Sequence, residues 1–300
     1  MRLSRRRLLV SAVGLAAGWT FGAPPVAAAP GLDHRSVARV IAEGVGFLTR
    51  AQPLGQYSPQ HHLLREAPSA APCKYWLFND NALAGHLLAR MRHPLWAVIL
   101  AELKRYGHET NGLHEVLWGV RAGETLDWMP CTHDYLSLTP ELDDGACSQS
   151  CAELGADIVC TEVRRGTPMP DWQEYADLAL LGALNQALLH ERKAARRTFA
   201  TAMGMFDWAE GGFVDKASVS GEGYLTYKVG LALHVGLTLG AVTRAQAGAL
   251  AEILCAQQES AIAGKVGGFY THYGQTGART CDVNTETTAL ALWGLWTYRS

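Results

Sequence analysis

Basic surface and long apolar runs are both scarce in this chain. Residues 1–28 carry four of its 26 basic side chains, so residues 29–300 set 22 basic side chains against 28 acidic ones, a net charge of −6. No basic stripe remains that could follow a phosphate backbone. After residue 28 no stretch is long and apolar enough to cross a bilayer. We therefore expect neither nucleic acid nor a membrane span in the mature protein.

The first 28 residues predict an export signal. Arg5 and Arg6 precede an apolar run from Leu8 to Phe21, and small residues up to Ala28 offer a cleavage site. A double arginine before a mildly apolar run is typical of a twin-arginine signal, and this run is too short to span a bilayer. An ordinary arginine-rich secretory signal is the alternative. Either signal predicts a periplasmic or extracellular protein.

Cysteine is present in an odd number, seven. In an exported protein cysteines favour disulfides, and an odd count leaves at least one thiol over. Cys147, Cys151 and Cys160 crowd one segment, where we expect at least one bridge. The alternative is a metal site built from these three with Cys131 and His133. Because their spacing does not match a standard zinc knuckle, we expect neither a metal nor another cofactor.

Eight helical segments are predicted, and two kinds alternate strictly along the chain. Four combine charge with an apolar stripe, the pattern of a helix with one wet face: residues 34–49, 94–106, 192–206 and 243–258. Four are apolar nearly all round after their first turn and should be buried: residues 76–91, 172–189, 224–239 and 283–298. The alternation predicts antiparallel pairs with the buried helices inside.

The predicted fold is all-α, a single α/α toroid of about four helical hairpins over residues 29–300. An irregular bundle of the same helices is the alternative. Residues 109–170 interrupt the pattern with a β-like run at 116–120, glycines, prolines and four cysteines. Because so long a structureless loop is unusual in a compact domain, we expect a cysteine-rich insertion containing a small β-hairpin. It would cap one end of the toroid, unless it is only decorative.

A glycine phrase occurs twice near the C-terminus. Gly-Gly-Phe stands at 211–213 and again at 267–269, followed each time by a polar loop, a polar helix start and an apolar helix. Such repetition is the mark of a helical repeat protein. If the inner helices all point the same way, their polar starts gather at one mouth.

Each inner helix brings at least one carboxylate to that mouth. Some of these acids are helix caps, which suit the positive end of the helix dipole. Glu286, Tyr227 and Lys228 instead fall inside otherwise apolar helices, where a charge is costly unless it is paired. These groups should face one another or a wet cavity. An internal ion pair of Lys228 with Glu286 or Asp80 is the alternative to catalysis.

Aromatic and polar side chains gather in the helix starts and in the insertion. Aromatic rings beside carboxylates suit a sugar, and they also suit a terpenoid whose developing cations are stabilised by ring quadrupoles. His133 and His272 lie in polar context, where histidine serves as acid or base, whereas His86 and His234 lie in apolar helices and read as core residues. The predicted substrate-binding residues are Trp76, Asn81, Trp118, Trp128, Tyr224, Phe269, His272 and Asn284.

With its Gly-Gly-Phe turn, loop, acid and apolar inner helix, the last ninety or so residues resemble the repeats of the α/α-toroid enzymes. These include the six-hairpin glycosidases and the squalene-cyclase and prenyltransferase toroids. The glycosidase resemblance implies paired acids at the mouth, one protonating the leaving oxygen and one activating water. By position the matching acids are Asp80 and Glu286, with Glu222 in reserve.

The leading hypothesis is a secreted enzyme, a hydrolase or lyase, that acts on carbohydrate. Its predicted catalytic residues are Asp80, Glu286, Glu222, Lys228, Tyr227 and His133. A second hypothesis is an isomerase, hydratase or cyclase of a terpenoid or other apolar small molecule. It would use Cys151 or Cys160 with Asp80 and His133 as a proton relay. A third is a non-catalytic toroid that binds glycan or peptide.

Overall fold

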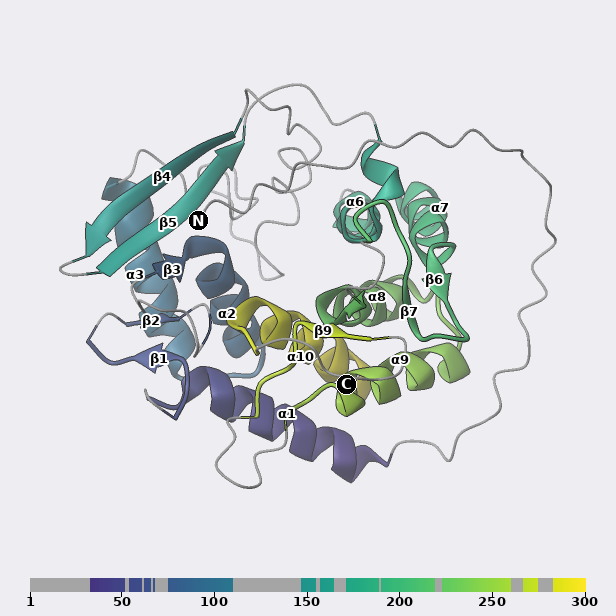
Figure 1. Ribbon diagram of the computed structural model, residues 1–300, viewed down its shortest axis with the longest axis horizontal. Coiled ribbons are helices and arrows are strands. Elements are labelled where there is room, and N and C mark those ends of the chain that lie inside the picture. Colours follow the sequence, from purple (N-terminus) through teal and green to yellow (C-terminus); the bar gives the residue numbers. More distant parts are fainter. Residues whose placement is uncertain are drawn as a thin grey trace.

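Over the residues that it describes, the computed structural model is mostly helical, with short strands (Figure 1). The residues it describes are 33–51, 54–60, 62–65, 67, 75–109, 147–154, 157–164, 171–188, 190–218, 223–259, 267–274 and 283–300. In these ranges no helix is long and apolar enough to cross a membrane.

Eight α-helices lie in the described ranges, and each overlaps one of the predicted segments. They are α1 (His34–Thr49), α2 (Phe78–Arg90), α3 (Leu95–Glu109), α6 (Ala176–Leu188), α7 (Arg192–Met203), α8 (Thr226–Leu239), α9 (Arg244–Ala256) and α10 (Thr285–Arg299). The prediction of a helical fold is confirmed at this level.

The apolar helices pack against one another, and the amphipathic helices lie outside them. Helix α8 packs between α6 and α10, and α10 also packs on α2. Around this inner row, α7 covers α6, α9 covers α8, α1 covers α10 and α3 covers α2 (Figure 1). Three hairpins therefore run from an inner to an outer helix, and the first helix of the described chain pairs with the last.

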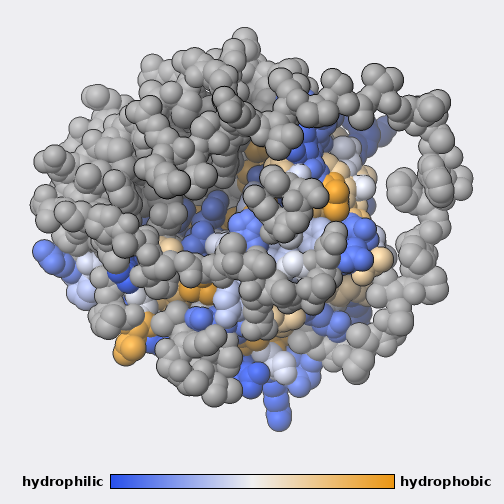
Figure 2. All heavy atoms as spheres, in the orientation of Figure 1, coloured by the Kyte–Doolittle hydropathy of each residue, from blue (hydrophilic) through white to orange (hydrophobic). Residues whose placement is uncertain are grey.

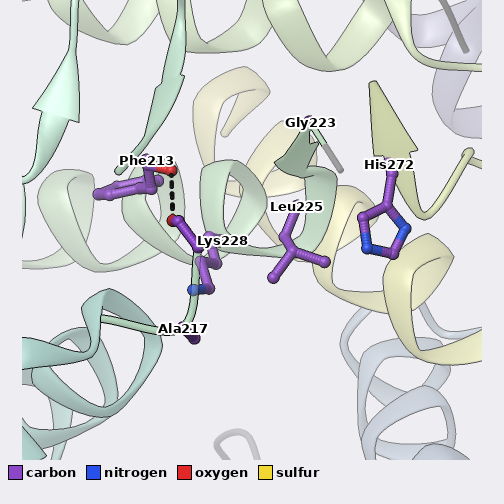
Figure 3. Close-up of a pocket in the computed structure, with 7 residues that line it drawn as sticks. Phe213, Ala217, Gly223, Leu225, Lys228 and His272 are labelled. Carbon is purple, nitrogen blue, oxygen red and sulfur yellow. Dashed lines mark hydrogen bonds between the residues drawn. The ribbon is translucent and has the colours of Figure 1, made fainter. Parts of the chain in front are cut away.

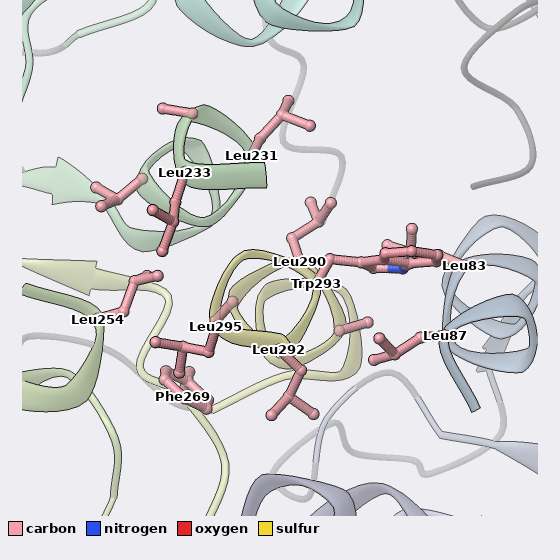
Figure 4. Packing of buried hydrophobic residues seen from close by; sticks show 14 of the residues in the cluster. Leu83, Leu87, Leu231, Leu233, Leu254, Phe269, Leu290, Leu292, Trp293 and Leu295 are labelled. Atoms are coloured by element: carbon pink, nitrogen blue, oxygen red, sulfur yellow. The ribbon is translucent and has the colours of Figure 1, made fainter. Parts of the chain in front are cut away.

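The core lies between the inner helices and the outer helices that cover them (Figure 4). Helix α10 is buried along most of its length, with Leu292 and Leu295 fully buried. Two glycines bring α8 and α10 into backbone contact: a Cβ on Gly294 would lie 2.6 Å from the carbonyl oxygen of Gly230. Neighbouring helices cover the other faces, with α6 and α9 on α8 and with α1 and α2 on α10, so both helices are apolar on nearly every side.

On the face shown in Figure 2, hydrophilic residues predominate over the described surface, and hydrophobic ones are scattered. The exposed large hydrophobic side chains of the described residues are Leu54, Trp96, Val98 and Val214. Scattered apolar residues of this kind are normal on a protein surface and do not by themselves indicate a binding site.

The strands are short and mostly tie the helix starts together. Their pairs are β1 (Tyr57–Ser58) with β2 (Leu63–Leu64), β6 (Phe206–Asp207) with β7 (Gly212–Phe213), and β8 (Tyr224–Leu225) with β9 (His272–Tyr273). A three-stranded sheet places β5 (Asp157–Arg164) between β3 (Tyr75–Leu77), which is parallel to it, and β4 (Cys147–Leu154), which is antiparallel.

Strands β4 and β5 form a β-hairpin within the segment predicted as an insertion. The β-like run at 116–120 lies outside the described residues. The hairpin register sets Cys151 opposite Cys160. Opposed Cα atoms of antiparallel strands lie about 4.5–5.5 Å apart, a separation that a disulfide can span. A disulfide in this segment stays a prediction, and so does the role of the segment as a cap.

The inner helices begin on the same side of the molecule. At the start of α2, the Asn81 side chain accepts from the Leu64 N–H (2.6 Å) and donates to the Leu64 carbonyl (2.9 Å). At the start of α10, the Thr285 hydroxyl donates to the carbonyl of Arg65, the residue that follows β2. The starts of α2 and α10 therefore meet at β2.

Backbone links connect this end to the start of α8. The Thr226 N–H donates to the Thr271 carbonyl (3.0 Å), and a β-bridge pairs Tyr270 with Val283 just before α10. The starts of α8 and α6 are joined by side chains, which form the candidate site.

Candidate functional site

A buried lysine lies at the centre of the site. Lys228 is the third residue of α8 and is 1% exposed. Its ammonium donates to Oδ2 of Asp215 at 2.5 Å, and the Asp215 side chain is fully buried. An internal ion pair was one of the two predictions for Lys228. The partner that the structure gives it is Asp215, from the loop after β7, rather than Glu286 or Asp80.

Asp215 also holds neighbouring backbone in place. Its Oδ2 accepts from the N–H of Ala176, the first residue of α6, at 2.8 Å. Its Oδ1 accepts from the Ala217 N–H and from the Ser218 hydroxyl, both at 3.1 Å. One carboxylate therefore satisfies a free amide of α6, compensates the buried lysine of α8 and orders its own loop.

A second carboxylate faces the same lysine from α6. Oδ1 of Asp177 lies 4.0 Å from the Lys228 ammonium, and the Asp177 side chain keeps 24% of its surface exposed. Oδ2 of Asp177 accepts a hydrogen bond from the Tyr227 hydroxyl at 2.8 Å. Residues 227 and 228 of α8 thus both point to the start of α6. One ammonium serves two carboxylates here.

A second, exposed ion-pair group flanks this network. Lys216 binds Asp171 and, at 2.8 Å, Glu174 of the 3-10 turn η1 (Trp172–Glu174). Hydrogen bonds to these two carboxylates raise the pKa of Lys216 above its ordinary value. Because the Lys216 side chain is 41% exposed, its ion pairs contribute little to stability.

A small cavity of about 30 Å³ opens beside Lys228 (Figure 3). Its lining residues are Phe213, Ala217, Ser218, Gly223, Leu225, Lys228 and His272. In Figure 3, Leu225 lies between Lys228 and His272. A cavity of this size holds one or two water-sized groups. A whole sugar ring would not fit, but a single substituent would.

The predicted acid pair lies at the starts of two adjacent helices. Asp80 is in the first turn of α2 and is 3% exposed, and Glu286 is in the first turn of α10 and is half-buried. Helices α2 and α10 pack against each other. The two acids therefore belong to neighbouring helix starts on the side of the molecule where Lys228 lies.

Several predicted substrate-binding residues serve the fold. The Asn81 amide bonds the backbone of β2, and Asn284 caps α10 by accepting from the Thr287 N–H at 2.8 Å. Phe269 is fully buried, and Tyr224 packs on Tyr273 with ring centroids 5.6 Å apart. Of the predicted substrate-binding residues whose side chains are described, His272 lines the cavity.

Other predicted residues cannot be placed. Trp118, Trp128, His133 and Glu222 lie outside the described residues. Trp76 is in β3, but its side chain lies outside the described part of the chain. In that described part, no group of three or more His, Cys, Asp or Glu side chains could hold a metal ion.

Two inner-helix histidines lie away from the helix starts. Burial lowers the pKa of His86 and of His234 to about 4, and the Arg90 cation contributes for His234. His234 shares a 2.8 Å hydrogen bond with the Thr297 hydroxyl and packs on Trp293. Both imidazoles are therefore neutral at pH 7, in keeping with their interpretation as core residues.

Sequence reasoning missed Asp215, the carboxylate that pairs with Lys228. Asp177 is covered only by the general prediction that each inner helix brings a carboxylate to the mouth. A weak signal for Asp215 existed, because it follows the first Gly-Gly-Phe phrase by two residues. Because Asp215 lies in a loop, it belongs to no helical or strand periodicity that could predict a contact with α8.

Comparison with protein-family models, with curated proteins and with solved structures yields no match for this chain. Function must therefore be inferred from the geometry of its own residues.

Proposed function

We propose that this chain is an exported α/α-toroid enzyme that acts on carbohydrate by acid/base chemistry where its inner helices begin. The observation that carries the proposal is the gathering of ionisable side chains at these helix starts. Asp80 comes from α2, Asp177 from α6, Lys228 from α8 and Glu286 from α10. Of these four residues, Lys228 is buried and lines the small cavity, and a buried charge beside a cavity is more common at functional sites than elsewhere.

The ring form of the fold belongs to the proposal. Support comes from the packing order α6, α8, α10, α2 and from the outer helix that covers each inner one. We further propose that the segment around the β4–β5 hairpin caps the ring. We also propose that the twin-arginine signal of residues 1–28 directs the protein to export.

Asp80 and Glu286 are the proposed acid/base pair. One carboxyl group protonates the leaving glycosidic oxygen, while the other removes a proton from the water that attacks the anomeric carbon. Lys228 assists by donating a hydrogen bond near the reacting sugar, and Tyr227 assists by holding the Asp177 carboxylate through its hydroxyl. Glu222 and His133 stay further candidates, in loops outside the described residues.

The test is a panel of poly- and oligosaccharides incubated with the purified protein and analysed for products by mass spectrometry. Asp80→Asn and Glu286→Gln should each lower kcat by about 100-fold or more, because general acid/base catalysis contributes about 10²–10⁴-fold. The matched control is Glu43→Gln on the outer helix α1, whose side chain makes a surface ion pair with Arg39. It should keep full activity.

Two results would contradict the proposal. Full activity in both carboxylate variants, with folding verified by circular dichroism, would remove Asp80 and Glu286 from catalysis. Binding of glycans without any product would favour the non-catalytic toroid instead.

A further inference from the structure

The cavity beside Lys228 combines apolar and polar walls. Phe213 and Leu225 supply apolar surface, while Lys228, Ser218 and His272 supply polar groups (Figure 3). Its volume of about 30 Å³ leaves room for roughly two water-sized groups, since one water needs about 10–15 Å³. A short substituent with one carbon and one polar atom matches both the size and the mixed lining.

The charges around the cavity decide which polar atom it accepts. The Lys228 ammonium lies 2.5 Å from Asp215 and 4.0 Å from Asp177, so two carboxylates already share one cation. A further carboxylate would enter next to uncompensated negative charge, in a site with little water to screen it. A neutral hydroxyl can accept a hydrogen bond from the Lys228 ammonium and donate one to the Ser218 oxygen without that cost.

We propose that this cavity binds the hydroxymethyl group of a neutral hexose and thereby selects hexoses over pentoses and uronic acids. The inference rests on the proposed function and adds its substrate class. The methylene would lie against Leu225 and Phe213, and the hydroxyl would accept a hydrogen bond from Lys228. Ala217 is exposed and lines the cavity, so it marks the rim through which the substituent enters.

The test compares oligosaccharides that differ only at carbon 6. One series is the 1,4-linked tetrasaccharides of glucose, xylose and glucuronic acid, and the other is their galactose, arabinopyranose and galacturonic acid counterparts. We expect kcat/KM for the hexose to exceed that for the pentose by about 10- to 100-fold, the usual value of one small group in a fitted pocket. The uronate should be the poorest substrate of each series.

Ala217→Leu provides the structural test because its longer side chain fills the cavity from the rim. The hexose-to-pentose ratio of kcat/KM should fall to near one. Ala209→Leu, an exposed alanine in the turn between β6 and β7, is the matched control and should keep the full ratio.

The outcomes separate this inference from the proposed function. If no oligosaccharide of the panel is turned over, the proposed function fails. If hexoses are turned over but the ratio is unchanged in Ala217→Leu, only the cavity assignment fails. A preference of the unmodified protein for a uronate or a pentose overturns the assignment without any variant.

Discussion

At the scale of single residues, the two lysines of the site differ in solvent exposure. Lys228 is 1% exposed and pairs with a fully buried carboxylate, whereas the Lys216 side chain is 41% exposed. A buried ion pair adds little stability over an apolar pair of the same shape, but removal of one partner leaves an uncompensated buried charge. The same substitution should therefore have very different costs at the two positions.

Lys228→Met should lower the free energy of unfolding by about 3–5 kcal/mol, because it leaves the Asp215 carboxylate buried without its cation. Lys216→Met should cost no more than about 1 kcal/mol. Urea unfolding at pH 7 measures both values. Equal losses in the two variants would show that the Lys228–Asp215 pair is not buried in solution.

Stability should fall as pH drops from about 6.5 towards 4. The folded-state pKa of His86 and of His234 is lowered from 6.5 to about 4. Between pH 6.5 and 4 the unfolded chain therefore binds more protons than the folded protein. The free energy of unfolding is highest above pH 6.5, where both states carry neutral histidines, and it falls on acidification. Because both imidazoles keep some solvent contact, we expect about 1–2 kcal/mol from each.

Urea unfolding between pH 7.5 and 4.5 measures this dependence. His234→Gln should remove about half of it and leave the part that belongs to His86, while His34→Gln, at the exposed start of α1, should leave it unchanged. A pH dependence that is the same in both variants would rule out His234 as a contributor.

At the scale of elements, α8 and α10 pack closely because glycine faces backbone. A Cβ on Gly230 would lie 2.5 Å from the Leu290 carbonyl oxygen, and the space beside Gly294 is as tight. Glycine costs helix stability in isolation. Its presence in two buried helices therefore indicates a packing requirement, in contrast to Gly248 on α9, whose nearest contact would be 3.8 Å away.

Gly294→Ala should destabilise the protein by about 1–3 kcal/mol, because the added methyl group forces α8 and α10 apart. Gly248→Ala should instead stabilise it by about 0.5–1 kcal/mol through helix propensity and a less flexible unfolded chain. Thermal and urea unfolding of the two variants, side by side, measure the difference. Stabilisation by Gly294→Ala would contradict the close crossing.

At the scale of the whole molecule, the two ends of the described chain pack against each other. Helix α1 covers α10, and a Cβ on Gly44 of α1 would lie 2.9 Å from the Leu292 side chain. Beside them, the buried Gln258 amide donates to the carbonyls of Val40 (2.7 Å) and Gly267 (3.0 Å). Helix α10 thus depends on α1 for its cover.

Removal of α1 should therefore disrupt the whole domain rather than one end of it. We expect a chain that begins at residue 52 to lose cooperative unfolding and its near-ultraviolet circular dichroism, because the apolar face of α10 becomes exposed. A chain that begins at residue 29 is the control and should unfold in a single transition. Cooperative unfolding of the shorter chain would show that α1 is dispensable.

The amino-acid sequence by itself determined the helices and their burial. Apolar residues at helical spacing mark one face of α1, and an apolar surface all round marks α8 and α10, so local periodicity is enough to separate outer from inner helices. It also placed Lys228 where only a paired charge is tolerated. These properties depend on neighbours within one element.

Only the tertiary structure decided which elements and side chains meet. Strict alternation is compatible with hairpins that run from an outer to an inner helix and with hairpins that run from an inner to an outer one. Among the described helices, α1 pairs with α10 rather than with α2, so the hairpins run from an inner to an outer helix. The partner of Lys228 likewise comes from a loop, at Asp215, rather than from another inner helix. A loop carboxylate has no periodic signal, and its direction is set by the close approach of α6 and α8, which no local pattern encodes.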